Sequence, residues 1–418
     1  MAVAAALLLV SLPAPRAAAE SVPEVERTRL RIVLAPSDDS ASVDVSGLSF
    51  GLLADRARNV AGLQLGLAFL DTTKSLAGLQ LGVGFNFVDG EADGAQVTGL
   101  ANFSAVARGG QLAIGINHAE QLRGVQVGIA NSAGDGWGAQ LGAMNSSRRF
   151  LGGRIGAVNG SEEFEGVEVG LLNFDGSVKG FQLGLLNLPC LPLATDCAEL
   201  PRDTSGVSIG AVNVAHATAG LDLALVNVAR EARGLHIGLV NLVWNDDGES
   251  LALLNLTRTG VHEVALYATD SAWLNTDLKL GSKHLFTVMT ASFKPGGAAS
   301  GASADLSSGG RRISVGLGLG WRFPIEWRRV VSLETELSAS RVRSNGTELA
   351  HAGPTLYELR LVSVLRIIEH ASLIGGLGLG LTTSGATDQV ILGHLATTWT
   401  GGDRSYRLAP EILAGIQL

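Results

Sequence analysis

The sequence predicts an all-β protein: a repeat β-solenoid of about 14 residues per coil, followed by a C-terminal antiparallel β-barrel of about eight strands. Three observations support this fold class. A G-x-Q-x-G-x-x-N motif recurs through the middle of the chain, the later part holds longer alternating segments, and 55 of the 418 residues are glycine. A short fixed period indicates stacked copies of one structural unit.

The composition limits the classes of partner and of membrane segment. Charged residues make up only 17% of the chain and the net charge is −8, whereas a nucleic-acid-binding protein would present a basic face. Past the N-terminus, the sequence has no unbroken apolar stretch of the roughly 18 residues that a membrane helix needs. We therefore expect neither a nucleic-acid partner nor a membrane-spanning helix.

The N-terminus has the pattern of an export signal. Residues 2–12 form an apolar segment, and three alanines precede Glu20, as in a small-residue cleavage site. The positively charged segment that usually comes first is missing, and an apolar strand or buried helix is the alternative. We predict a signal peptide over 1–19 and a linker over 20–45.

The repeat region is predicted over 46–257. In its copies, such as GVQVGIAN (124–131), apolar and other residues alternate, which is typical of a strand with one buried face. We expect the apolar side to be buried and the Gln column, including His236, to face outward. The last residue of each motif should stack into an Asn ladder at a corner of the coil. This Asn column comprises Asn131, Asn145, Asn159, Asn173, Asn187, Asn213, Asn227, Asn241 and Asn255.

One insertion, over 188–205, interrupts the repeats and carries both cysteines of the chain, Cys190 and Cys197. In an exported protein, two nearby cysteines indicate a disulfide. The segment has no histidine that could complete a metal site. We predict a structural Cys190–Cys197 disulfide.

A different architecture fits the same repeats less well. Each copy could be one strand of a single large outer-membrane barrel that acts as a pore or transporter. Membrane strands need about 9–11 residues, which would leave only about three to five of each 14-residue repeat for a turn. The spacing therefore favours the solenoid.

The segment 258–418 is predicted to form the barrel. Alternation in 311–323, 356–369 and 404–418 places apolar residues on one face and polar residues on the other, the pattern of an outer-membrane barrel. The polar side should pair inside the barrel. Its charged members are Glu334, Glu336, Arg360 and Arg366. Eight strands leave an interior that side chains fill, so no pore is implied. A soluble β-sandwich is the alternative.

Few residues suggest chemistry. The eight histidines have no metal-ligand spacing, and the Asp-Gly pairs are ordinary turn residues. We therefore expect no catalytic, cofactor-binding or metal-binding residues, no cofactor, and no enzymatic activity.

The G-x-Q-x-G-x-x-N units resemble the leptospiral-type surface-repeat proteins of Gram-negative bacterial envelopes. The segment LNTDLKLGSKHLFTVMTASFKPG (274–296) is also similar to the one that follows the repeats in that family. The resemblance covers most of 46–296. It implies an exported, envelope-associated protein and carries no functional residues. The Cys-bearing insertion and the long C-terminal strand set depart from the family.

Together these patterns predict a non-enzymatic protein of the outer membrane with a structural or adhesive role. Its expected partners are outer-membrane lipid and an envelope or host protein or polysaccharide. The expected contact surface is the Gln column, with Gln126, Gln140 and Gln182. An even-stranded barrel would place both termini in the periplasm, although the resemblance suggests repeats at the cell surface.

Overall fold

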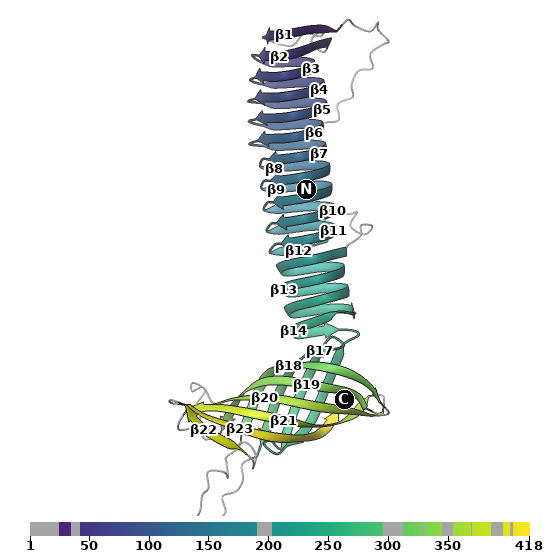
Figure 1. Cartoon of the computed structure of the whole chain (residues 1–418), viewed down its shortest axis with the longest axis vertical. Coiled ribbons are helices and arrows are strands. Elements are labelled where there is room, and N and C mark those ends of the chain that lie inside the picture. The colour runs from purple at the N-terminus through teal and green to yellow at the C-terminus, as the bar shows by residue number, and fades with distance from the viewer. Residues whose placement is uncertain are drawn as a thin grey trace, which may run out of the picture. The chain divides into compact units, whose positions relative to one another are not determined.

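The computed structural model describes residues 25–34, 42–189, 203–295, 312–327, 330–344, 354–368, 370–385, 396–401 and 404–418. These residues form strands and connections without an α-helix, so the predicted all-β class is confirmed (Figure 1). The predicted signal peptide and both cysteines lie outside the described residues.

Fourteen strands form the first sheet, in chain order. They are β1 (Glu26–Val33), β2 (Val43–Gly51), β3 (Ala54–Gly66), β4 (Phe69–Gly82), β5 (Phe85–Thr98), β6 (Ala101–Ala113), β7 (Ile116–Val127), β8 (Ala130–Leu141), β9 (Met144–Ile155), β10 (Val158–Val169), β11 (Leu172–Leu183), β12 (Leu186–Leu188), β13 (Asp203–Asp246) and β14 (Glu249–Thr257). β1 and the start of β2 lie within the segment expected to be a linker.

Successive strands of this sheet pair in parallel. Asn117 lies beside Asn131, and Asn159 beside Asn173, so equivalent residues of neighbouring strands are one repeat apart. Parallel pairing of consecutive strands without long crossovers requires the chain to wind as coils, which confirms the solenoid. The single large barrel is wrong, because its consecutive strands would pair antiparallel.

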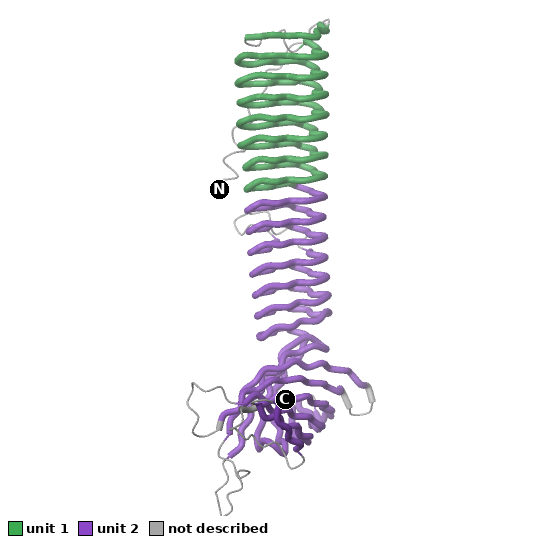
Figure 2. The backbone as a smooth tube through the Cα atoms, turned by 60° about the vertical axis from the view of Figure 1, so that its left-hand side comes forward, with its two compact units in different colours: residues 1–147 green, residues 148–418 purple. Residues whose placement is uncertain are grey.

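The chain divides into two compact units, residues 1–147 and residues 148–418 (Figure 2). The first unit contains solenoid coils. The second contains the remaining coils and a second, antiparallel sheet.

Thirteen of the coils turn one corner at a glycine with positive φ. There are seven such glycines in the first unit and six in the second, at the first residue of each motif. A Cβ built on Gly124 would lie 1.8 Å from the carbonyl oxygen of Gly109 in the preceding coil. Only glycine combines this backbone conformation with so close an approach.

The coil interior lies between two arms of different composition. The long arm contributes apolar side chains such as Leu76, Leu122 and Phe164, which are almost fully buried. The short arm, which follows the corner glycine, contributes the Gln column. Gln126 is 0% exposed, so the prediction that this column faces outward is wrong. The apolar residues that alternate with it face outward instead, and Ile129 is 59% exposed.

The second sheet has nine strands. They are β15 (Val261–Thr269), β16 (Leu274–Gly281), β17 (Leu285–Lys294), β18 (Arg312–Trp327), β19 (Val330–Ser344), β20 (Thr355–Ile368), β21 (Ala371–Gly385), β22 (Thr397–Gly401) and β23 (Arg404–Gln417). β23 pairs with β21 on one side and with β15 on the other, both antiparallel, which closes a ring of eight strands. β22 pairs with β23 outside this ring. The predicted eight-stranded barrel is therefore confirmed, and a sandwich of two open sheets is excluded.

Side chains alternate strictly along the barrel strands. On β20, Tyr357, Leu359 and Leu361 are exposed, whereas the intervening Glu358 and Arg360 are buried. Exposed apolar residues also follow β18 and β21, including Leu317 and Leu377. The barrel therefore has an apolar outer surface and a charged interior, as the alternation predicted.

Candidate functional site

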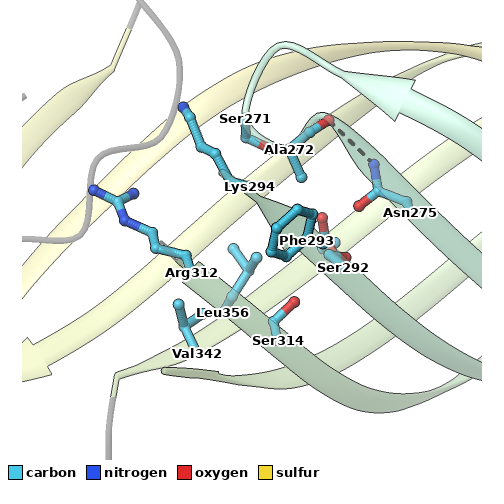
Figure 3. Close-up of a pocket in the computed structure, with 11 residues that line it drawn as sticks. Ser271, Ala272, Asn275, Ser292, Phe293, Lys294, Arg312, Ser314, Val342 and Leu356 are labelled. Carbon is cyan, nitrogen blue, oxygen red and sulfur yellow. Dashed lines mark hydrogen bonds between the residues drawn. The ribbon is translucent and has the colours of Figure 1, made fainter. Parts of the chain in front are cut away.

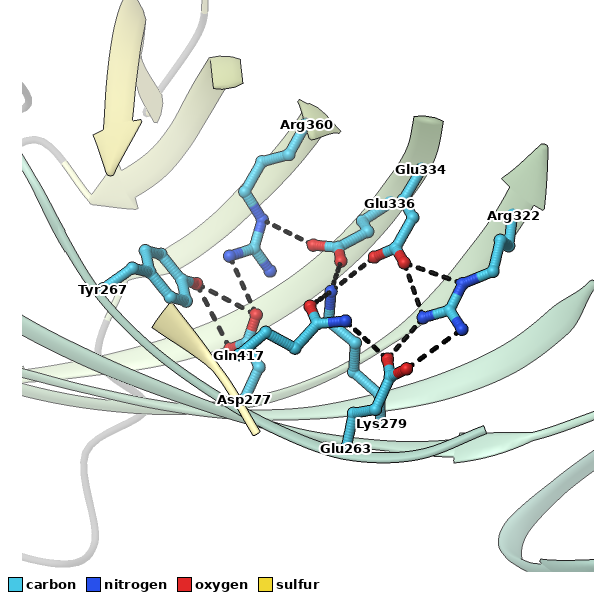
Figure 4. A network of polar contacts seen from close by, with 9 residues as sticks. All are labelled: Glu263, Tyr267, Asp277, Lys279, Arg322, Glu334, Glu336, Arg360 and Gln417. Carbon is cyan, nitrogen blue, oxygen red and sulfur yellow. Dashed lines mark hydrogen bonds and ion pairs between the residues drawn. The ribbon is translucent and has the colours of Figure 1, made fainter. Parts of the chain in front are cut away.

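The most highly charged site in the described part of the chain is the barrel interior. Its centre is the ammonium group of Lys279 on β16, which is 1% exposed. Lys279 Nζ lies 2.6 Å from Glu334 Oε2 and 2.6 Å from Glu336 Oε1, both on β19 (Figure 4). It also donates a hydrogen bond of 3.2 Å to Gln417 Oε1 on β23. One cation thus joins strands on opposite sides of the ring.

Two arginines extend this network in opposite directions (Figure 4). Arg322 on β18 donates from Nε to Glu334 Oε1 at 2.8 Å and also pairs with Glu263 on β15. Arg360 on β20 lies 3.1 Å from Asp277 Oδ2 and 3.4 Å from Glu336 Oε2.

The carboxylate of Asp277, at one end of this network, also accepts a hydrogen bond from a tyrosine. Tyr267 donates from its hydroxyl to Asp277, at 3.0 Å from Oδ2. Along this network, carboxylates and cations alternate across the lumen. Two further carboxylates, Glu358 and Glu411, are also buried but lie beside each other.

Small residues make room for these long side chains. Gly320 on β18 faces the lumen beside Phe286, and a Cβ built on it would lie 2.2 Å from the Phe286 ring. That ring in turn lies 5.5 Å from Lys279 Nζ, a cation–π distance. The glycines that alternate with apolar residues on β18 thus leave space inside the barrel.

The sequence located part of this site. Glu336 and Arg360 pair as predicted, and Glu334 is buried beside them. Arg366 is exposed and does not join the network, so its predicted place inside is wrong. Arg366 lies at the end of β20, where the last four residues of the strand are all exposed, so it is at the rim and not inside the lumen.

Sequence reasoning missed the partners on the other strands. Asp277, Lys279 and Arg322 were not predicted, although each occupies the polar side of an alternating strand. This position on the polar side was the signal in the sequence that these residues face the lumen. It could not show which of these residues face one another, because Lys279 and Glu334 are 55 positions apart.

A small cavity opens at the rim of the barrel where β17 ends and β18 begins (Figure 3). Its volume is about 40 Å³, and Lys294, Arg312 and Glu358 contribute charged groups to its lining. Cavities that bind metabolites are usually some 300–1,000 Å³. This one has room for a few waters.

The solenoid interior holds two hydrogen-bonded ladders. Asn131 Nδ2 donates to Asn145 Oδ1 at 2.9 Å and to the carbonyl oxygen of Leu141 at 2.9 Å. Equivalent bonds join Asn86 through Asn145 in the first unit, and Asn159 through Asn241 in the second. Asn255 donates instead to the carbonyl oxygen of Ser250, at 2.6 Å. The Gln column forms the second ladder, in which Gln140 donates to Gln126 Oε1 at 2.8 Å.

Charged residues replace glutamine in the second unit. Arg154 lies 2.8 Å from Glu168 and 2.6 Å from Asp175, and all three side chains are buried. Burial, reinforced by the nearby Asp175 carboxylate, raises the pKa of Glu168 well above its usual range.

A second polar pair lies further along the same column, where Asp222 and His236 approach to 2.8 Å. His236 is 1% exposed, so its predicted outward position is wrong. Gln126, Gln140 and Gln182 are likewise buried and cannot form the contact surface that we expected.

Within the described residues, no three His, Cys, Asp or Glu side chains are grouped in a way that could hold a metal ion. In the same residues, no helix is long and apolar enough to cross a membrane. Comparison with known protein families, with curated proteins and with solved structures gave no match.

Proposed function

We propose that this chain is an exported, non-enzymatic envelope protein whose barrel is embedded in the outer membrane and whose solenoid has a structural or adhesive role. The observation that carries the proposal is the inverted polarity of the barrel. Leu317, Leu359 and Leu377 are 48–65% exposed on its outside, whereas Lys279, Glu334 and Arg360 are at most 1% exposed inside. Water-soluble barrels have the opposite arrangement, and a lipid environment explains it.

The connection lengths support an orientation. At the rim next to the solenoid, the barrel strands are joined over 282–284, 328–329 and 369–370. At the other rim, 17 residues join β17 to β18 and ten join β19 to β20, whereas β15 and β16 are joined by four. Outer-membrane barrels have short periplasmic turns and longer extracellular loops. This pattern favours a periplasmic solenoid, although the resemblance to surface-repeat proteins suggests the opposite side.

The solenoid then supplies contact surface instead of chemistry. Its Asn and Gln ladders satisfy polar groups inside the coils, and its exposed surface repeats at the coil spacing. An envelope or host protein or a polysaccharide would meet this repeating outer surface, not the buried Gln column. The small rim cavity and the ion-paired network around Lys279 agree with a structural role.

Gel mobility and cell fractionation of the full chain test the proposal. The protein should sediment with the outer membrane, and after purification in detergent the unboiled sample should migrate faster than the boiled one. Leu317→Asp with Leu377→Asp, on the lipid-facing surface, should abolish membrane insertion. Ser132→Asp, on the solenoid, is the matched control and should insert normally. A wild-type protein recovered in the soluble fraction without detergent would refute the proposal.

A further inference from the structure

The outer surface of the short solenoid arm is apolar in the thirteen coils that turn at a glycine with positive φ. Three outward columns occupy the second, fourth and sixth residues of each motif, and we call their surface the apolar wall. In the first unit the fourth-residue column reads Phe50, Leu65, Leu81, Val97, Leu112, Val127 and Leu141. In the second unit it reads Ile155, Val169, Leu183, Ile209, Leu223 and Ile237. Within these described coils, none of the three columns contains a charged residue.

The wall is exposed and differs sharply from the opposite arm. Ile114 is 73% exposed and Leu112 is 48% exposed on the wall. The long arm instead exposes charged residues such as Arg123 and Lys179. No described residue covers the wall. Contiguous apolar patches of several hundred Å² are rare on water-exposed surfaces of monomers and mark an interaction surface.

The dimensions of the wall fit a protein interface. With strand residues about 3.3 Å apart and coils about 4.8 Å apart, five residues across seven coils give roughly 550 Å² in the first unit. The six coils of the second unit give roughly 480 Å² by the same spacing. Two copies facing each other would therefore bury about 1,000 Å² at either wall, the lower bound for a specific interface.

Lipid is a less suitable partner for the apolar wall than a second copy, because the coil next to the barrel ends in charged groups. The second-residue column changes to Glu249, which accepts hydrogen bonds from Ser282 and from the backbone of Leu285 in the turn at the barrel rim. Beside it, Lys283 and Asp247 form an exposed ion pair of 2.8 Å. On the proposed membrane topology this rim lies outside the hydrocarbon layer, so the coils extend into water.

We propose that the wall packs against the same wall of a second copy of this chain, which makes the protein a parallel dimer. Face-to-face packing is the usual way to cover an apolar sheet surface, and a second copy repeats at the same coil spacing. The parallel direction rests on the proposed function, since two barrels in one membrane share an orientation. Equivalent residues of the two copies then face each other at the same height.

Self-cross-linking of single cysteines tests this dimer. In a full-length Cys190→Ser/Cys197→Ser background, Leu112→Cys and Leu183→Cys should each form a covalent dimer on mild oxidation in detergent. Arg123→Cys and Lys179→Cys, on the long arm, are the matched controls and should not. Light scattering should give a protein mass twice that of one chain. Leu112→Asp with Leu183→Asp should halve it while the heat-dependent gel shift of the barrel persists.

Two results would contradict the parallel dimer. A one-chain mass with no cross-linking above the controls would refute it, and bound phospholipid in that monomer would identify lipid as the cover. Cross-links only between non-equivalent wall positions would refute the parallel arrangement. A missing gel shift would count against the proposed membrane barrel and not against wall pairing, so the two proposals fail separately.

Discussion

Two adjacent glycines, Gly109 and Gly110, allow a sharp test of how the coils stack. A Cβ on Gly109 would lie 2.1 Å from the carbonyl oxygen of Gly94 in the preceding coil, and its φ is 130°. A Cβ on Gly110 would have nothing within 4 Å. Alanine at these neighbouring positions therefore adds the same methyl group to the same strand in opposite environments.

The expected magnitudes follow from these two environments. For Gly109→Ala, the disfavoured backbone conformation costs about 1–3 kcal/mol, and forcing the coils apart adds about 1–3 kcal/mol. For Gly110→Ala, the stability should change by less than about 1 kcal/mol, in the stabilising direction, because alanine restricts the unfolded chain.

Hydrogen–deuterium exchange of peptides from β5 to β7 would measure the difference coil by coil, which suits a repeat protein whose unfolding is not two-state. Protection should fall by at least about tenfold in Gly109→Ala, since each 1.4 kcal/mol is a factor of ten, and should be kept in Gly110→Ala. Equal protection in the two variants would refute the stacking geometry.

Three further predictions concern buried polar groups. Glu168→Gln should stabilise its coils at neutral and alkaline pH. Because the pKa of Glu168 is raised, the folded state retains a proton that the unfolded chain loses, so the stability of the wild type decreases as pH rises above about 4.5. Urea titrations at several pH values should show this decrease in the wild type and not in the variant. Lys279→Met should destabilise the barrel by about 3–5 kcal/mol, because Glu334 and Glu336 lose the buried ammonium group that they share. It should lower the temperature at which the unboiled gel form converts; an unchanged temperature would contradict the network. Asn131→Ala should cost about 2–3 kcal/mol of local stability by exchange. It removes the hydrogen bonds that Asn131 donates to the Leu141 carbonyl oxygen and to Asn145 Oδ1, and the one that it accepts from Asn117. Ser132→Ala, one residue further on, is the control.

The repeat made the solenoid predictable, but it did not show which side of the strand faces inward. Period-two alternation separates Gln126 from Val125 and Val127 without orienting either set. The usual preference for apolar interiors gave the wrong answer, because glutamines can bond to one another along the stack. The same alternation was oriented correctly in the barrel, where apolar residues outside are typical of a membrane environment.

The charged contacts were only partly predictable, since they depend on register. Glu336 and Arg360 lie directly opposite each other on neighbouring strands, so alternation was sufficient to place them together. Lys279 reaches Glu334 across the lumen, and that contact depends on how the ring closes. Substitutions in the Gln column, such as Arg154 followed by Glu168, could have been noticed as opposite charges at the repeat spacing.

The two amide ladders differ in direction, and this bears on how long the stack can grow. In the first unit, the asparagines donate to the next coil, as Asn117 does to Asn131, whereas the glutamines donate to the previous one, as Gln126 does to Gln111. Aligned amides polarise one another and sum to a dipole, as peptide units do in a helix. Because the two rows run in opposite senses, their dipoles oppose each other. Coils of the first unit can therefore be gained or lost, by duplication or deletion of one repeat in the gene, without a growing electric field along the axis.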